Sequence, residues 1–199
     1  MRYLTRSAFA VVATAAALTL YGCSTMDERS EAGAPAPASS QGNAAELVGP
    51  ACASLPTSGP GSPAALAELP VASAAAQSPA LSTLVAAVQQ AGLVDTLNNA
   101  ENITIFAPTN DAFAKIPPAT LNQVLADKQA LTGILTYHVV GQRSTAADLE
   151  SGSLTTLQGG TITTAKVGDT YTANAAKVLC GNIQTRNATV YLIDTVLMP

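Results

Sequence analysis

Side chains that could perform chemistry are few in this chain of 199 residues, which contains one histidine and three cysteines. Catalysis by a nucleophile needs a base within hydrogen-bond reach, and His138 is the sole conventional candidate. No nucleophile elbow, zinc-binding helix, phosphate loop or pair of cysteines at zinc spacing accompanies it. Asp148 and Glu150 are two carboxylates in a loop, a spacing typical of a solvated turn. The sequence therefore predicts a protein that is not an enzyme and uses no metal or cofactor.

His138 itself is predicted to be structural. It lies among apolar neighbours in residues 136–140, which we expect to form a strand. A buried imidazole is normally hydrogen-bonded, and we expect its partner to be the side chain of Asn110 or Asp111. We favour this role over a ligand-binding or catalytic one.

The N-terminus has the pattern of an export signal. Two arginines precede an apolar run of about 13 residues, shorter than the roughly 20 that a membrane-spanning helix needs. The sequence therefore predicts a signal peptide over residues 1–22. Its end, Leu20-Tyr21-Gly22-Cys23, resembles the bacterial lipobox, although Tyr21 is larger than the residue usual at that position.

Lipidation of Cys23 would attach the exported protein to the membrane through its N-terminus. We expect it at the outer face of the cell membrane or in the cell wall, and partly released. The alternative is ordinary signal-peptidase cleavage, which would release the whole protein. Without residues 1–22, seven basic side chains remain against thirteen acidic ones, a formal net charge of −6. This charge, and basic residues that are scattered singly, exclude nucleic acid as a predicted partner.

Residues 23–62 are rich in Ala, Pro and Ser and contain no Ile, Phe or Tyr, a composition that we do not expect to form a core. We expect a disordered, extended tether, whose reach from Cys23 to Cys52 would be up to about 90 Å. Asn102-Ile103-Thr104 and Asn187-Ala188-Thr189 match the N-glycosylation pattern, to which we give little weight in a bacterial protein.

Residues 63–199 carry the periodicity of one folded domain. The first half favours helices and the second half favours strands, so the sequence predicts an α+β fold. Helices are expected over residues 78–92, 111–116, 120–125 and 129–135, and strands over residues 102–107, 136–140, 153–157, 161–165, 170–174 and 189–197. Thr109 is expected to cap the helix that starts at Asn110.

Three stretches of this domain resemble the fasciclin family. They are Thr104-Ile105-Phe106-Ala107-Pro108-Thr109-Asn110-Asp111-Ala112-Phe113, then Tyr137-His138-Val139-Val140, then Val190-Tyr191-Leu192-Ile193-Asp194-Thr195-Val196-Leu197-Met198-Pro199. The combination of a signal, an Ala/Pro-rich tether and one such domain is most similar to actinobacterial, in particular mycobacterial, surface lipoproteins and secreted antigens. The resemblance implies a wedge of two β-sheets flanked by short helices and a role in adhesion. It also implies that the motif residues are structural: Thr109, Asn110, Asp111, Tyr137, His138 and Asp194.

Cys52 and Cys180 remain as a single possible pair once Cys23 is acylated. In an oxidising compartment outside the cytoplasm we expect them to form a disulfide, which would extend the folded unit upstream to about Cys52. The alternative is two free thiols.

The predicted function is that of an adhesion or surface-interaction module. Its partner would be a surface protein, a glycan or a host receptor, and the sequence does not select the binding face. The alternative is a carrier of a small apolar ligand or lipid, because a wedge lined by Leu, Val and Ile could open between its sheets and helices.

Overall fold

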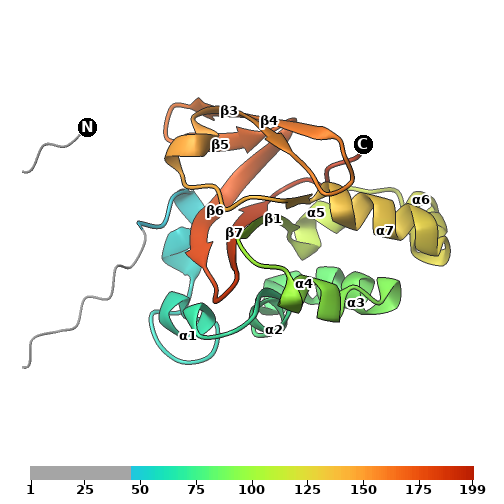
Figure 1. The fold of residues 1–199 in the computed structure, drawn as a ribbon, viewed down its shortest axis with the longest axis horizontal. Coiled ribbons are helices and arrows are strands. Elements are labelled where there is room, and N and C mark those ends of the chain that lie inside the picture. Colours follow the sequence, from blue (N-terminus) through green and yellow to red (C-terminus); the bar gives the residue numbers. More distant parts are fainter. Residues whose placement is uncertain (1–45) are drawn as a thin grey trace, which may run out of the picture. The chain divides into compact units, whose positions relative to one another are not determined.

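The computed structural model describes residues 46–199, which form an α+β fold in which helices largely precede strands (Figure 1). The helical elements are η1 (Pro50–Ser54), α1 (Pro63–Ala67), α2 (Val71–Ala76), η2 (Pro79–Leu81), α3 (Ser82–Ala91), α4 (Val94–Asn99), α5 (Asn110–Ala114), α6 (Pro118–Ala126), α7 (Lys128–Tyr137) and η3 (Ala147–Leu149). The strands are β1 (Ile103–Pro108), β2 (Val139–Val140), β3 (Ser151–Thr155), β4 (Thr161–Val167), β5 (Thr170–Ala173), β6 (Ala176–Gln184) and β7 (Ala188–Ile193). Cys23, the predicted signal peptide and residues 24–45 of the predicted tether lie outside the described residues.

The strands form one hydrogen-bonded series in the order β2-β1-β7-β6-β5-β4-β3. At its centre β1 and β7 run parallel, with Ile105 opposite Val190 and Ala107 opposite Leu192. All other neighbouring strands are antiparallel. β1 is buried along its whole length and β7 nearly so, as expected for parallel strands covered on both faces.

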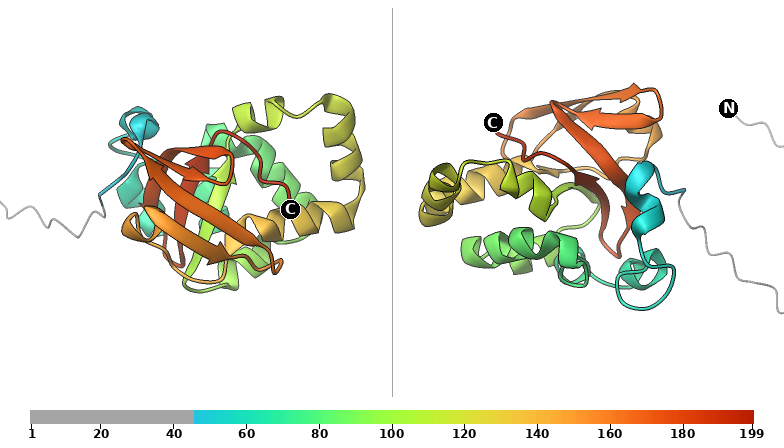
Figure 2. Two further views of the ribbon diagram at one scale, coloured as in Figure 1. Left: turned by 90° about the horizontal axis from the view of Figure 1, so that it is seen from above. Right: turned by 180° about the vertical axis from the view of Figure 1, so that it is seen from behind.

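The sheet curls into two layers because β6 pairs with β7 along most of its length and with β5 at its first residues. Register shifts between Val178 and Ile183 interrupt the β6–β7 ladder, and such irregularities bend a strand. Figures 1 and 2 show β3, β4 and β5 as the second layer, facing β1, β7 and the rest of β6. The predicted α+β wedge flanked by short helices is confirmed.

Alternate side chains of the central strands enter two different cores. Val190 on β7 and Ile105 on β1 pack against the helices, together with Leu84 and Val88 of α3. Tyr191 and Phe106 point to the other side and fill the wedge between the two layers. The helix-facing side of β1 and β7 is thus the surface on which α2, α3 and α4 lie. Among residues 46–199, no helix is both long and apolar enough to cross a membrane.

The segment before α1 is folded onto the sheet, so the boundary predicted at residue 62 is too late. Val48 pairs with Gly181 of β6, each donating its N–H to the carbonyl of the other at 3.1 and 2.7 Å. Cys52, in η1, forms the predicted disulfide with Cys180. The correction extends beyond Cys52, because Leu47 and Leu55 pack against the core beside the helices and Val48 packs against the core of the wedge. Figure 2 shows this segment, in cyan, beside β6.

The observed helices and strands also differ from the predicted ones. The longest described strand, β6, and the short helices α1, α2 and α4 were not expected from the sequence. Residues 136–140 are not a strand throughout, since α7 continues to Tyr137 and only Val139 and Val140 pair with β1. His138 is therefore the C-terminal cap of a helix rather than a strand residue.

Candidate functional site

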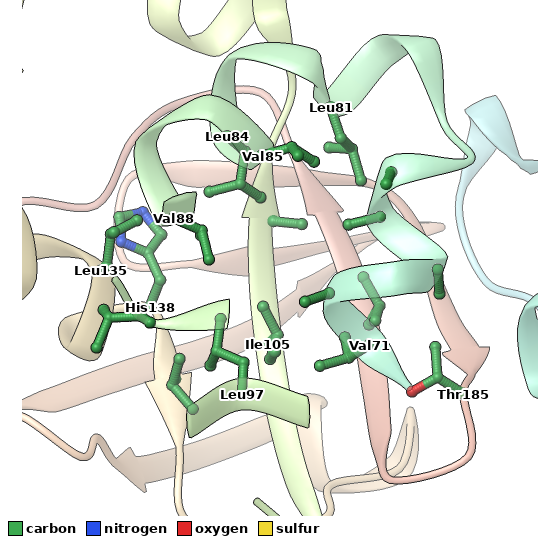
Figure 3. Close-up of a pocket in the computed structure, with 18 of the residues that line it drawn as sticks. Val71, Leu81, Leu84, Val85, Val88, Leu97, Ile105, Leu135, His138 and Thr185 are labelled. Atoms are coloured by element: carbon green, nitrogen blue, oxygen red, sulfur yellow. The ribbon is translucent and has the colours of Figure 1, made fainter. Parts of the chain in front are cut away.

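A cavity of about 300 Å³ lies between the helix layer and the central strands (Figure 3). Its floor consists of Ile105 and Ala107 on β1 and of Val190 and Leu192 on β7. The helices α2, α3 and α4 supply most of its walls. Figure 3 shows the labelled side chains spread from Thr185 at one end to Leu135 and His138 at the other. This cavity is the candidate functional site.

The α3 wall follows from the helical spacing that the sequence displays. Leu84 and Val88 are buried one turn apart, and Val85 beside them is half-buried and also lines the cavity. Gly92 ends the helix with φ 74°, the left-handed conformation that glycine adopts without strain. The predicted helix over residues 78–92 is thus confirmed as η2 followed by α3.

Asn187, in the turn between β6 and β7, ties two of the wall helices to the sheet. Its Oδ1 accepts from Val71 N–H at 2.9 Å, at the start of α2. Its Nδ2 donates to the carbonyls of Leu97 at 2.8 Å and Ala100 at 2.6 Å, at the end of α4. Sequence reasoning considered this residue only as a glycosylation pattern. Its side chain is in fact buried and fully engaged inside the protein.

Asn110 plays the corresponding part for α3. Its Oδ1 accepts from Thr83 N–H at 3.0 Å, and its Nδ2 donates to the carbonyl of Pro79 at 2.9 Å. These bonds connect the start of α5 to the start of α3. The side-chain amides of Asn110, at the start of α5, and Asn187, in the β6–β7 turn, therefore hold the helices that surround the cavity.

His138 lies at one end of the cavity with only 2% of its surface exposed. Nδ1 lies 2.8 Å from the carbonyl oxygen of Ile134, and Nε2 accepts from Leu197 N–H at 2.9 Å. The prediction of a buried, hydrogen-bonded imidazole is correct, but the expected partners Asn110 and Asp111 are wrong. Because the ring lies at the end of a helix, it reaches the backbone of that helix and of the C-terminal segment. Burial lowers the pKa of His138 to about 4, against a smaller raising effect of the Ile134 carbonyl.

Thr109 and Asp111 contribute less than their motif suggests. Thr109 occupies the N-cap position of α5, but its hydroxyl makes no capping bond, so the predicted side-chain cap is wrong. Its Oγ1 is buried without a hydrogen-bond partner in the part of the chain that the structure describes. Asp111 is exposed in the first turn of α5, where a carboxylate interacts favourably with the helix dipole.

Tyr137 fastens α7 to the second layer of the wedge. Its hydroxyl donates to the carbonyl of Thr161 at 3.0 Å and accepts from Asn174 Nδ2 at 3.1 Å. Its ring lies against Gly160, where an added Cβ would come within 2.6 Å of Cε2. A glycine is therefore needed opposite this ring, and Tyr137 is structural.

Asp194 joins the end of β7 to two other elements. Its carboxylate accepts from Lys177 N–H of β6 at 2.8 Å and from Lys115 Nζ after α5 at 2.9 Å. Partial burial alone would raise the pKa of Asp194, but these bonds and the Lys115 charge outweigh it and leave the pKa lowered. The carboxylate thus stays ionised as a structural acceptor.

The remaining candidates for chemistry are occupied elsewhere. Asp148 accepts from Thr145 N–H at 2.7 Å, a bond that lowers the pKa of its carboxyl, and Glu150 pairs with Lys166 at 2.9 Å. Both carboxylates are exposed, as predicted for a solvated turn. Within residues 46–199 no three His, Cys, Asp or Glu side chains gather as a metal site. The cavity itself is lined by apolar and uncharged polar residues.

Residues 79–199, from η2 to the C-terminus, match the Fasciclin domain family. The chain belongs to the fasciclin family. The fold of this domain is similar to that in a solved structure of a FAS1 domain pair from the insect cell adhesion molecule Fasciclin I, with a TM-score of 0.58 and 19% identity. That likeness covers 68% of this chain and 52% of the insect one, and at such low identity it shows the fold alone.

Two mycobacterial relatives align with most of this chain. MPB83 of Mycobacterium bovis, a cell surface glycolipoprotein, is 42% identical over 212 aligned residues, which cover 97% of this chain and 95% of the relative. MPB70 of the same species, an immunogenic protein, is 42% identical over 164 residues, which cover 78% of this chain and 84% of the relative. The predicted similarity to mycobacterial surface antigens with a single fasciclin domain is confirmed.

Proposed function

We propose that this protein is a lipid-anchored surface module that displays its fasciclin domain outside the cell membrane. There the domain binds a surface protein, a glycan or a host receptor, and it catalyses no reaction. The observation that carries the proposal is the match to the cell surface glycolipoprotein MPB83 over 97% of the chain. An alignment that leaves out so few residues must include Leu20-Tyr21-Gly22-Cys23, the lipobox-like stretch.

The described part of the chain supports a binding role over a catalytic one. Both ring nitrogens of His138 are bonded to the backbone, so the imidazole has no free nitrogen to act as a base. The carboxylates of Asp148 and Glu150 are held by Thr145 and Lys166. A disulfide-closed fold suits an oxidising compartment outside the cytoplasm.

The anchoring half of the proposal is tested with Cys23→Ala. Wild-type protein should enter the detergent phase of a two-phase extraction, because the two or three acyl chains of a bacterial lipoprotein hold it stably in a membrane. The variant should remain in the aqueous phase, whereas the control Ser24→Ala, an alanine replacement at the next residue, should still enter the detergent phase. Intact cells should bind an antibody against the domain only while Cys23 is present.

Mass spectrometry of the mature N-terminus completes the experiment. We expect an acylated Cys23 as the first residue, despite the large Tyr21 next to the cleavage position. A Cys23→Ala variant that stays in the membrane fraction, or a mature N-terminus at another residue, would refute the anchor.

A further inference from the structure

We propose that the cavity under α2, α3 and α4 binds the hydrocarbon chain of a separate lipid molecule, whose head group remains in solvent. Its volume of about 300 Å³ is at the lower end of the range of small-molecule pockets. An apolar cavity of about 150 Å³ is already large enough to bind benzene in another protein. Protein interiors are otherwise close-packed, so a space of this size among apolar side chains is unusual.

The lining selects an apolar ligand, because it is mostly aliphatic and its two buried polar residues, Thr185 and His138, already have hydrogen-bond partners, as does the half-buried Thr136. Thr185 Oγ1 donates to the carbonyl of Ala188 at 2.9 Å, and Thr136 Oγ1 donates to that of Thr132 at 2.8 Å. Both nitrogens of His138 are engaged by the backbone. Among residues 46–199, none of those that line the cavity carries a charge. A polar or ionised group placed inside would lose its hydration without gaining a hydrogen bond.

The shape and chemistry of the lining favour a flexible chain over a planar ring. Ring ligands are usually held by stacking on aromatic side chains. Here the aromatic rings of the lining, Phe106 and His138, are almost completely buried, and Phe106 packs against Tyr191 with ring centroids 5.8 Å apart. Leu, Val and Ala side chains from three helices make up most of the wall, extended from Thr185 to Leu135 in Figure 3.

The cavity is open to solvent along part of its wall. Leu192 belongs to a central strand, yet its side chain is only half-buried, and so are Val85 and Leu97 on facing helices. Leu157, also in the lining, is 51% exposed. An apolar chain can therefore enter while its polar end stays outside. This inference rests on the cavity alone and does not depend on the anchor at Cys23.

The test uses the full chain as wild type and as Cys23→Ala, with the fluorescent fatty acid cis-parinarate and with hexadecanoate. We expect cis-parinarate to bind with one molecule per chain and hexadecanoate to displace it. Native mass spectrometry should then show one hexadecanoate per protein. Absence of saturable binding, or several molecules per chain, would overturn the proposal.

A matched pair of variants separates the cavity from general surface hydrophobicity. Val85→Phe puts an aromatic ring into the cavity, whereas Val167→Phe makes the same replacement on β4 at a valine that is 66% exposed and outside the lining. We expect Val85→Phe to weaken cis-parinarate binding by about tenfold or more, and Val167→Phe to change it by less than about twofold. Equal effects of the two variants would contradict the assignment.

Two further measurements keep the proposal falsifiable. If Val85→Phe fails to fold, Leu97→Phe fills the cavity from the opposite helix with the same expected loss of binding. In methyl-labelled protein of unchanged sequence, hexadecanoate should shift the signals of Leu84, Val88 and Leu97, and shifts confined to Val167 and Met198 would overturn the proposal. Binding by Cys23→Ala but not by wild type would mean that the protein's own acyl group fills the cavity, which would refute a separate ligand.

Discussion

His138 is a residue whose protonation state is fixed by the backbone around it. Nδ1 faces the carbonyl of Ile134 and must carry the proton, whereas Nε2 accepts from Leu197 N–H and must not. Only the neutral tautomer meets both demands, and burial further disfavours the charged ring. The imidazole thus links the end of α7 to the C-terminal segment as long as it stays neutral.

We therefore predict that the fasciclin domain loses stability between pH 6.5 and about 4. In the unfolded chain the histidine has its ordinary pKa of 6.5, while in the folded domain burial lowers the pKa to about 4. Between these values the unfolded state binds more protons than the folded state. The free energy of unfolding therefore decreases as the pH is lowered, by about 3 kcal/mol over the whole interval. Urea unfolding at a series of pH values measures this loss.

The control for this prediction is His138→Gln, which cannot titrate. The carboxylates of both proteins take up protons in the lower part of the interval, so the difference between the two slopes isolates the histidine. The wild-type protein should show the steeper fall. Equal slopes would mean that His138 is already charged, or is accessible to solvent, in the folded domain.

At the scale of elements, the sequence predicted those helices and strands whose position depends on a local pattern of residues. β1 and β7 are β-branched runs, and Gly92 marks the end of α3, so these elements were expected. β6 was missed because Gly181 and Asn182, the latter at φ 59°, interrupt its alternation at the register shifts. The Ala-rich α2 looks like tether in composition, and only its contacts with the sheet distinguish it.

The position of the cavity, like that of α2, depends on contacts between parts of the chain that are distant in sequence. The prediction of a space lined by Leu, Val and Ile followed from composition, but its position depends on how three short helices lie over β1 and β7. Asn187 determines part of that arrangement through bonds to Val71, Leu97 and Ala100, residues that are distant in sequence. A single sequence gives no sign of such contacts, so the most informative side chain of the site was not recognised.

Replacing Asn187 with alanine should loosen the attachment of α2 and α4 to the sheet. The change leaves the N–H of Val71 and the carbonyls of Leu97 and Ala100 without their side-chain partner, and each unsatisfied buried group costs about 1–3 kcal/mol. We expect a loss of at least that order in the free energy of unfolding, measured by urea denaturation. Faster amide exchange should be confined to these two helices and the β6–β7 turn.

Asn99→Ala serves as the matched control, since Asn99 is an exposed asparagine at the end of the same α4. Its replacement should change the stability by less than about 0.5 kcal/mol. Similar losses in both variants would argue that the effect comes from the helix itself and not from the Asn187 bonds.

At the scale of the whole molecule, the folded unit is longer than the family match. The match begins at residue 79, yet backbone pairing with β6 begins at Val48. The Cys52–Cys180 disulfide closes a span of 128 residues between the start of the described chain and β6. Composition alone placed residues 46–62 in the tether, whereas the single possible cysteine pair predicted correctly that the last part of this segment is attached.

We predict that this closure contributes much of the stability of the domain. In the chain-entropy account, opening a loop of this length costs up to about 4–5 kcal/mol, an upper figure because residual structure in the unfolded chain reduces it. Urea unfolding should show a large loss in the free energy of unfolding for the double variant Cys52→Ala/Cys180→Ala and none for Cys23→Ala.

Thiol titration of denatured, unreduced Cys23→Ala protein should find no free thiol, and a chain that starts at residue 63 should expose one. Two reactive thiols in the denatured Cys23→Ala protein, or a chain starting at residue 63 that is as stable as one starting at residue 46, would contradict the closure.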